Sequence, residues 1–234
     1  MTRLVVSELA KHFGGNRVLD RVSFSMRHGS LALVGPNGAG KTTLLNALAG
    51  VVRPSAGRIE FDDLDIAGLS TWKIARLGIV KTNQVVRPLH SLTVDEHLRV
   101  FTRGNDPVRR ARALRATNLE EFREQTADQL PFGALKRLEL AEAIVTGARL
   151  LLLDEPIGGL SRLEAEGIVE TLRTLRAQGQ AMIIVEHRLR EILPFVDDVV
   201  ALDRGRIIYD GPPSGFYADA AVRDAYIGRT DAGG

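Results

Sequence analysis

Cysteine is absent from the 234-residue sequence, so disulfide bonds and thiolate metal sites are excluded. No uninterrupted apolar stretch approaches the roughly 20 residues of a membrane-spanning helix, and residues 1–8 lack the apolar segment of a signal peptide. Neither charge is in marked excess, since 31 Lys and Arg oppose 29 Asp and Glu. This balance gives no global indication of nucleic acid or an anionic membrane as partner. We therefore expect one sizeable core, with or without a small subdomain. If the protein acts on a membrane process, it would do so through a partner.

A glycine-rich stretch at residues 35–43, which we call the phosphate loop, organises the chain. It lies between the apolar runs 30–34 and 44–50, which predict a strand before it and a helix after it. The stretch fits the pattern G-x-x-x-x-G-K-[ST] and not the dinucleotide pattern G-x-G-x-x-G. It therefore predicts a nucleotide-binding site made of Gly35, Pro36, Asn37, Gly38, Ala39, Gly40, Lys41, Thr42 and Thr43.

The residue types of this loop suit a polyphosphate. Glycines at 35, 38 and 40 let the backbone curl with its N–H groups facing inward, where side chains would block the phosphates. The positive end of the following helix dipole favours the same anion. We expect Lys41 to reach the β- and γ-phosphates of ATP, and the hydroxyl of Thr42 to hold Mg²⁺.

Predicted strands and helices alternate around the phosphate loop, which is typical of a parallel α/β core. The apolar runs 150–153 and 181–185 predict buried parallel strands. Near the N-terminus, strands are predicted at 4–6 and 18–26, with a turn at 11–15. Between 93 and 149 helical patterns dominate, with helices predicted at 93–101, 108–118, 120–128 and 135–148. Capping boxes at 93–96 and 161–164 mark the beginnings of two helices.

Polar residues follow three of the predicted strands. Asp154 and Glu155 follow one buried strand, Glu186 and His187 follow another, and Gln84 lies near the end of a strand that begins at 78. Two carboxylates directly after four buried leucines favour a functional site over a simple turn. A lone histidine or glutamine at a strand end is usually an ordinary polar residue, so these positions count only together with the other motifs.

The phosphate loop, Gln84, Leu130–Ala134, Leu150–Pro156 and His187 occur in the order known from one family. Over essentially its whole length the chain resembles the ATP-binding subunits of ABC transporters. Within that family the chain most resembles the G-type ATPases of branched-chain amino-acid importers, on four short stretches: 13–15, the Pro-Phe-Gly of 131–133, 186–187 and 225–228.

This resemblance implies a fold and a domain organisation. The fold is α/β, a P-loop (RecA-like) ATPase core with a mainly parallel sheet, N-terminal antiparallel β strands and an inserted helical subdomain. The whole chain, 1–234, would be a single ABC ATPase domain. Residues 1–86 and 150–234 would form its nucleotide-binding core, and residues 87–149 its helical, signature-containing subdomain.

The resemblance also implies roles for individual residues. Asp154 would hold Mg²⁺ through water, and Glu155 would act as general base on the attacking water. Gln84 would touch both Mg²⁺ and that water, and His187 would contact the γ-phosphate. The implied catalytic set is Glu155, His187, Gln84 and Lys41, and the implied Mg²⁺ set is Thr42, Gln84 and Asp154.

Two further sites follow from the same resemblance. Phe13, where the family usually has tyrosine, would stack on adenine, and Val18 would also contact the nucleotide. The signature loop, Leu130, Pro131, Phe132, Gly133 and Ala134, would bind the γ-phosphate of ATP held by the opposite protomer. Pro131 replaces the usual serine and removes a hydroxyl donor. Ser161 stands where the family has an aspartate that links the two sites.

The implied function is that of an ATP-hydrolysing subunit, with ATP and Mg²⁺ as cofactors, that powers import of branched-chain or other hydrophobic amino acids. The implied partners are a second ABC ATPase, as a homodimer or heterodimer, and integral membrane permease subunits that dock near Val85–His97. We expect a cytoplasmic protein, peripheral on the inner face of the cell membrane. It would touch neither nucleic acid nor the transported substrate.

Three alternatives remain open. One is the ATPase of a lipid or lipopolysaccharide exporter. Another is a soluble ABC ATPase acting on DNA or the ribosome, although the sequence lacks the second ATPase half or the large insertions of such proteins. The last is an ATP-binding regulatory module with little turnover, against which the intact Glu155 argues.

Two groups of basic residues are interpreted as solvent-exposed. A run of arginines without interleaved aromatics predicts a solvated helix face and not a nucleic-acid surface; its members are Arg109, Arg110, Arg112 and Arg115. The remaining histidines follow no ligand spacing and are expected on the surface; they are His12, His28, His90 and His97.

Overall fold

The computed structural model describes residues 3–27, 29–82, 89, 91–102 and 104–227. Four strands form an antiparallel sheet in the order β2-β1-β4-β5. Their bounds are Leu4–Phe13 for β1, Asn16–Met26 for β2, Ala56–Phe61 for β4 and Leu64–Asp65 for β5. Strand β1 continues through Phe13, so the predicted turn at 11–15 is wrong except at Gly14–Gly15. The residues 11–13 pair with β2 across the hairpin.

The second sheet has six strands in the order β10-β9-β3-β8-β7-β6. Strands β9, β3, β8, β7 and β6 run parallel, and β10 pairs antiparallel with β9. The predicted parallel α/β core is therefore confirmed. The bounds are Ser30–Val34 for β3, Ile79–Lys81 for β6, Leu150–Asp154 for β7, Ala181–Val185 for β8, Asp198–Asp203 for β9 and Arg206–Gly211 for β10.

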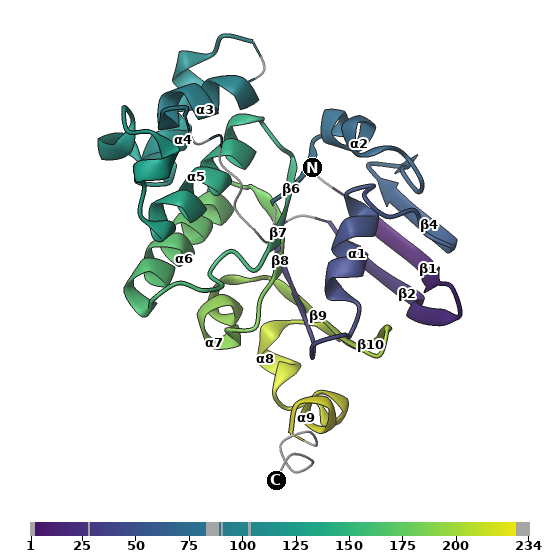
Figure 1. The fold of residues 1–234 in the computed structure, drawn as a ribbon. Coiled ribbons are helices and arrows are strands. Elements are labelled where there is room, and N and C mark those ends of the chain that lie inside the picture. The colour runs from purple at the N-terminus through teal and green to yellow at the C-terminus, as the bar shows by residue number, and fades with distance from the viewer. Residues whose placement is uncertain (1–2, 28, 83–88, 90, 103, 228–234) are drawn as a thin grey trace.

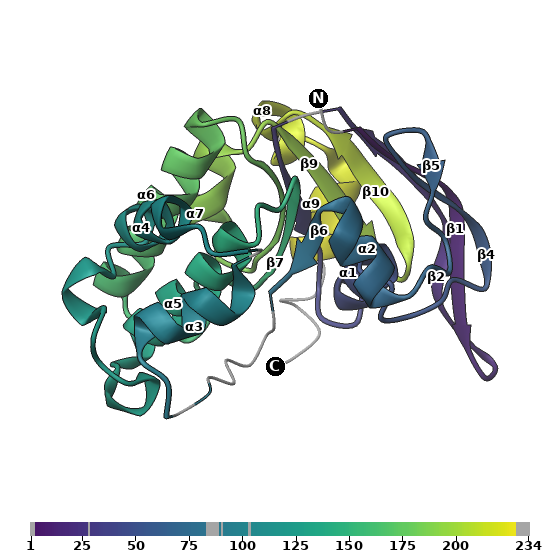
Figure 2. The same ribbon diagram turned by 90° about the horizontal axis from the view of Figure 1, so that it is seen from above.

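The six-stranded sheet is covered on both faces. Side chains alternate along its strands, so Leu31 and Leu33 join one core while Ala32 and Val34 join another. The first core also receives α1 (Lys41–Leu48), α2 (Thr71–Leu77) and the antiparallel sheet. The second receives α6 (Arg162–Ala177), α7 (Leu189–Ile192), η3 (Leu193–Phe195), α8 (Pro213–Phe216) and α9 (Ala220–Ile227). Figures 1 and 2 show the antiparallel sheet and α6 on opposite sides of this sheet.

Beside the second core lies a group of helices that we call the helical region: α3 (Val94–Phe101), α4 (Pro107–Ala116), η1 (Glu120–Phe122), η2 (Ala127–Gln129) and α5 (Phe132–Val145). It has a small apolar core of its own, in which Val94 and Leu98 of α3 meet Leu114 of α4 and Leu138 of α5. Both predicted capping boxes are confirmed. Thr93 caps α3 together with Glu96, and Ser161 caps α6 together with Glu164.

The predicted helix at 120–128 is wrong. Two short 3₁₀ turns, η1 and η2, lie there, separated by a turn, a bend and an isolated β-bridge at Thr126. The carbonyl oxygens of Arg123 and Gln125 accept hydrogen bonds from the backbone N–H groups of Asp95 and Val94, at 3.1 and 3.0 Å. Because the first N–H groups of a helix have no intrahelical acceptor, the start of α3 holds this segment out of helical geometry.

Two predictions of exposure are wrong. His97 is buried in the helical region, where its Nδ1 lies 2.8 Å from Oε1 of Glu142 and its Nε2 lies 3.0 Å from the carbonyl oxygen of Leu89. Arg110 is also buried, with Nη1 3.3 Å from Oδ1 of Asn105. His12 is half-buried in β1, and His28 and His90 lie outside the described residues. No helix in the described ranges is long and apolar enough to cross a membrane.

Candidate nucleotide-binding site

The phosphate loop connects the end of β3 to the start of α1. Gly35 has φ 145°, and a Cβ on it would lie 2.1 Å from the carbonyl oxygen of Leu202. Gly40, the N-cap of α1, has φ 107°, and a Cβ there would lie 2.9 Å from the carbonyl oxygen of Val18. Both glycines are therefore required by the packing of the loop on its own protein. A Cβ on Gly38 would meet nothing within 4 Å.

A cavity of about 270 Å³ opens above this loop. Its wall is built from one end of β2, the loop itself and two residues that follow β7 and β8. The lining residues are Val18, Asn37, Gly38, Ala39, Gly40, Lys41, Thr42, Thr43, Glu155 and His187. The structure thus brings most of the predicted nucleotide-binding residues together with two members of the predicted catalytic set.

Lys41 folds back across the loop. Its Nζ donates hydrogen bonds to the carbonyl oxygens of Gly35 at 2.7 Å and Pro36 at 3.0 Å. Burial lowers the pKa of the Lys41 ammonium, and the carboxylates of Glu155 and Asp154 oppose that shift. These contacts fix the ammonium within the loop, beside the cavity that the loop lines.

Asp154 ends β7 and is almost completely buried. Neither of its carboxylate oxygens accepts a hydrogen bond, although Nζ of Lys81 lies 3.2 Å from Oδ2 as an ion pair. A buried carboxylate with vacant acceptor positions, close to Lys41 and the start of α1, suits a hydrated Mg²⁺. Within the described ranges no cluster of three His, Asp or Glu residues could hold a metal. The cation would therefore depend on Thr42, water and the nucleotide as well.

Glu155 and His187 meet at the mouth of the cavity. Nε2 of His187 lies 3.1 Å from Oε1 of Glu155. Glu155 has φ 52°, which is rare for a residue with a side chain and is typical of functional positions. Its N–H donates to the carbonyl oxygen of Val185, and its own carbonyl accepts from Gly158 at 3.0 Å. The neighbouring parallel strands β7 and β8 thus deliver the two side chains to one place.

The remaining predicted site residues either lie away from the cavity or lie outside the described residues. Phe13 lies at the tip of the β1–β2 hairpin, 49% exposed, with Nζ of Lys11 4.7 Å from its ring centroid. It does not line the cavity. Gln84 lies outside the described residues, as do 85–88 and 90 of the predicted docking segment. Leu89, in that same segment, is half-exposed.

The signature loop begins α5. Pro131 is the N-cap of the helix and makes no side-chain capping hydrogen bond, and Phe132 is 49% exposed. The predicted helix at 135–148 therefore starts three residues earlier and ends at Val145. A Cβ on Gly133 would lie 2.7 Å from Oε1 of Glu164, the capping-box residue of α6. The glycine thus allows α5 and α6 to approach closely.

Sequence reasoning missed two residues beside the site. Lys81 is the ion-pair partner of Asp154, and only the parallel pairing of β6 with β7 could have indicated this. Glu186 was noted as a neighbour of His187 but received no role, although it is 3% exposed and bonded to the loop after β7. A charged residue directly after five buried strand residues was the available signal.

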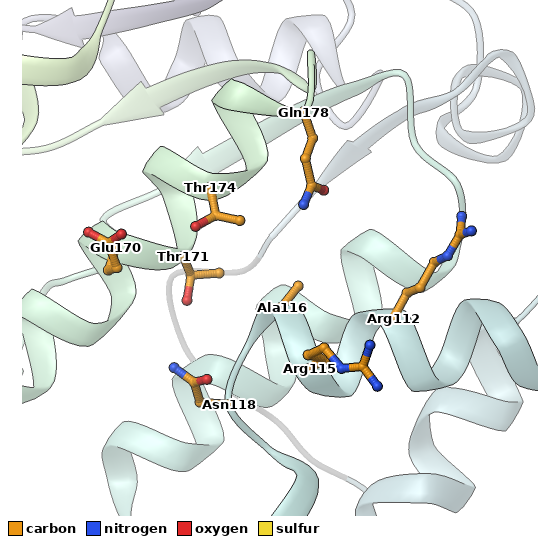
Figure 3. A pocket seen from close by; sticks show the side chains of 8 residues that line it. All are labelled: Arg112, Arg115, Ala116, Asn118, Glu170, Thr171, Thr174 and Gln178. Carbon is orange, nitrogen blue, oxygen red and sulfur yellow. The ribbon is translucent and has the colours of Figure 1, made fainter.

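A larger cavity of about 540 Å³ lies elsewhere, between α4 and α6 (Figure 3). Arg112 and Arg115 lie on one wall, and Thr174 and Gln178 lie on the other. No residue of the phosphate loop, β7 or β8 lines it. The size of a cavity alone therefore does not locate the nucleotide in this protein.

A sequence-family comparison matches residues 19–158 to the ABC transporter family. The match covers more than half of the chain, including the phosphate loop, the signature loop, Asp154 and Glu155. This chain belongs to the ABC transporter family. It is an ATP-hydrolysing subunit of a transporter, as the family resemblance implied.

Curated relatives of this ABC ATPase align over nearly its full length. The branched-chain amino acid transport protein BraF of Pseudomonas aeruginosa is 33% identical over 96% of this chain and 97% of its own. LivG of Salmonella typhimurium, with the same described transport role, is 32% identical over the same shares. The lipopolysaccharide export protein LptB of Escherichia coli is 31% identical over 97% of this chain and 98% of its own.

Solved structures agree with the fold. A nucleotide-free ATP-binding cassette from an ABC transporter superposes with a TM-score of 0.87 at 28% identity, over 97% of this chain and 99% of that one. A cassette in its ADP conformation gives the same values. The predicted P-loop ATPase fold is confirmed.

Proposed function

We propose that this ABC ATPase powers the import of branched-chain or other hydrophobic amino acids. The relatives BraF and LivG support this assignment, since both carry that transport role. The single observation that carries the catalytic part is the contact between Glu155 and His187 at the mouth of the phosphate-loop cavity. We also propose residues 1–86 and 150–234 as the nucleotide-binding core and 87–149 as the helical subdomain.

In this proposal the loop holds the triphosphate through its backbone N–H groups, and Lys41 exchanges its loop carbonyl acceptors for the β- and γ-phosphate oxygens. Glu155 accepts a proton from the attacking water, and His187 fixes the carboxylate and contacts the γ-phosphate. Thr42, Asp154 and Gln84 would hold Mg²⁺, which supplies charge neutralisation at the phosphates when it is bound. Phe13 and Val18 complete the nucleotide site.

A second ABC ATPase chain, either a copy or a relative, completes the site in this proposal. Its signature loop, 130–134, approaches the γ-phosphate with the N-terminus of α5. Hydrolysis removes the phosphate that bridges the two chains, so the interface opens. A solved relative, cbiO1 of Clostridium perfringens, is described as part of a transporter complex. By analogy we propose permease subunits that dock near Val85–His97, which places the chain on the cytoplasmic face of the membrane.

Export of lipopolysaccharide or lipid is the second candidate, because LptB is almost as similar as BraF. Affinity capture of the tagged chain from detergent-solubilised native membranes, followed by mass spectrometry, separates the two. We expect integral subunits of an amino-acid permease, and binding of labelled leucine, isoleucine or valine by the captured complex. Capture of a lipid-export permease would replace the import assignment, and capture with ribosomes or DNA would refute both.

A further inference from the structure

Glu186 joins the two chain segments that carry Glu155 and His187. The side chain is 3% exposed and lies directly after β8. Its Oε1 accepts a hydrogen bond of 2.8 Å from the N–H of Ile157, two residues beyond Glu155. Its Oε2 accepts one of 3.1 Å from the N–H of His187. One carboxylate therefore links the loop after β7 to the segment after β8.

The hydrogen-bond geometry uses both oxygens of the Glu186 side chain as acceptors. Both oxygens face backbone N–H donors, and among the described residues no Lys or Arg forms an ion pair with Glu186. An amide would replace one of these oxygens with an NH₂ donor that faces another donor. The pKa of Glu186 is raised, chiefly by burial, although the N–H groups of Ile157, His187 and Arg188 oppose the shift.

The segment held by Glu186 is the one that determines where the Glu155 carboxylate lies. Glu155 sits in a tight turn, with its N–H bonded to Val185 and its carbonyl bonded to Gly158. Ile157, inside that turn, is fully buried and has its N–H bonded to Glu186. A shift of Ile157 would therefore move Glu155 relative to His187, whose own backbone is bonded to the same carboxylate.

We propose that Glu186 is a positioning residue for ATP hydrolysis. It holds Glu155 and His187 in their relative positions through its hydrogen bonds to the backbone N–H groups of Ile157 and His187. The proposal rests on the proposed roles of Glu155 and His187. Glu186 does not line the phosphate-loop cavity. Its loss is therefore expected to affect the chemical step and to leave nucleotide binding unchanged.

The test compares three variants of the full chain with the wild type: Glu186→Gln, Glu186→Asp and the control Glu166→Gln. Glu166 is an exposed carboxylate on α6 that pairs with Arg162 of the same helix. Phosphate release gives kcat and KM for ATP, and a fluorescent ATP analogue gives the affinity. Amide NMR reports the shift of the Ile157 N–H, whose acceptor changes only in the Glu186 variants.

We expect Glu186→Gln to lower kcat roughly 10- to 100-fold, as a small misplacement of catalytic groups does, with KM changed less than about twofold. Glu186→Asp, which keeps a carboxylate, is expected to restore part of kcat and of the Ile157 amide shift. Glu166→Gln is expected to match the wild type. If Glu186→Gln does not fold, a folded Glu186→Asp with lowered kcat and unchanged KM supports the proposal.

Wild-type kcat in either folded Glu186 variant would overturn the proposal. So would a parallel loss of kcat, ATP affinity and folded fraction, because it would show a role in stability alone. Glu155→Gln in the same series separates this result from the proposed function. If Glu155→Gln hydrolyses ATP like the wild type, the assignment of the general base fails, whatever the Glu186 variants do.

Discussion

The phosphate-loop side of the molecule and the signature-loop side differ in how completely they are built. Around the phosphate loop, Lys41, Glu155 and His187 line one cavity, where Lys41 is hydrogen-bonded to the loop and His187 to Glu155. At the signature loop, Pro131 caps α5 without a side-chain hydrogen bond, and Phe132 projects half-exposed. The phosphate-loop side has a cavity lined by side chains that suit a triphosphate, whereas the signature-loop side presents a helix N-terminus whose N-cap residue has no hydroxyl donor.

From this difference we propose a division of roles between two chains. One chain would bind ATP through its phosphate-loop side alone, because the residues that line that cavity come from β2, the loop, β7 and β8. Closure of the proposed dimer would need the signature loop of another chain. Changes on the first side should therefore abolish binding or chemistry, and changes on the second should adjust only the rate.

The largest effect is expected at Glu155. Glu155→Gln removes the proposed general base but keeps the shape of the side chain, so turnover should fall about 10³-fold, within the range known for such groups. ATP affinity should be retained, because the loop and Lys41 are untouched. Phosphate release and a nucleotide-binding titration check both parts, and Glu166→Gln, an exposed glutamate on α6, is the matched control.

In the helical region, His97→Gln should lower the free energy of unfolding by about 2 kcal/mol, because Glu142 and the carbonyl of Leu89 lose a buried partner. Burial acts to lower the pKa of His97, but Glu142 outweighs it and the pKa is raised. The stabilisation is complete below pH 6.5 and is lost as the pH rises through the raised pKa. Urea unfolding of both proteins at pH 6 and pH 9 measures this, and equal differences at the two pH values would argue against it.

In the α/β core, the ion pair between Asp197 and Arg176 makes the stability depend on acidic pH. Asp197 accepts hydrogen bonds from the N–H of Ser30 at 2.8 Å and from Arg176, and chiefly Arg176 lowers its pKa to about 2. Its stabilisation is complete above pH 3.8 and is lost as the pH falls towards 2. Asp197→Asn should cost about 1.5 kcal/mol, at the low end for charged hydrogen bonds because the pair is partly exposed. Thermal melts of the variant and the wild type measure this loss. In these melts Asp198→Asn, at the exposed neighbouring position, should be near neutral.

The smallest effect is expected at Pro131. Pro131→Ser restores a hydroxyl at the N-cap of α5, which is also a better cap, and one added hydrogen bond to phosphate could speed turnover up to about tenfold. Affinity for ATP in the separate chain should stay the same. Steady-state phosphate release at several protein concentrations checks this, with Pro131→Ala as control. A rise in affinity without a rise in rate would count against the division between the two sides.

Sequence patterns correctly predicted those strands and helix starts that are decided by neighbouring residues. The strand before the phosphate loop, the helix after it, both capping boxes and the buried strands after residues 149 and 180 are confirmed, because each is decided by neighbouring residues. The helix predicted at 120–128 is wrong because its carbonyl groups bond to the start of α3, far away in the sequence. No periodicity in residues 120–128 carries that information.

The site itself was predicted only in part. The loop residues, Glu155 and His187 do line one cavity, whereas Phe13 lies outside it and Gln84 lies outside the described residues. Lys81 and Glu186 were missed because their partners, Asp154 and Ile157, belong to other strands and loops. His97 was expected on the surface, since nothing in its neighbours reveals Glu142, 45 residues away.

The most direct measurement is the affinity of the dilute, separate chain for ATP, titrated for the wild type, Lys41→Ala and Pro131→Ser. If the grip on the triphosphate belongs to the phosphate-loop side alone, Lys41→Ala should bind at least about 100-fold more weakly, as expected for the loss of a buried charged contact. Pro131→Ser should then bind like the wild type. Wild-type affinity in Lys41→Ala would contradict the account.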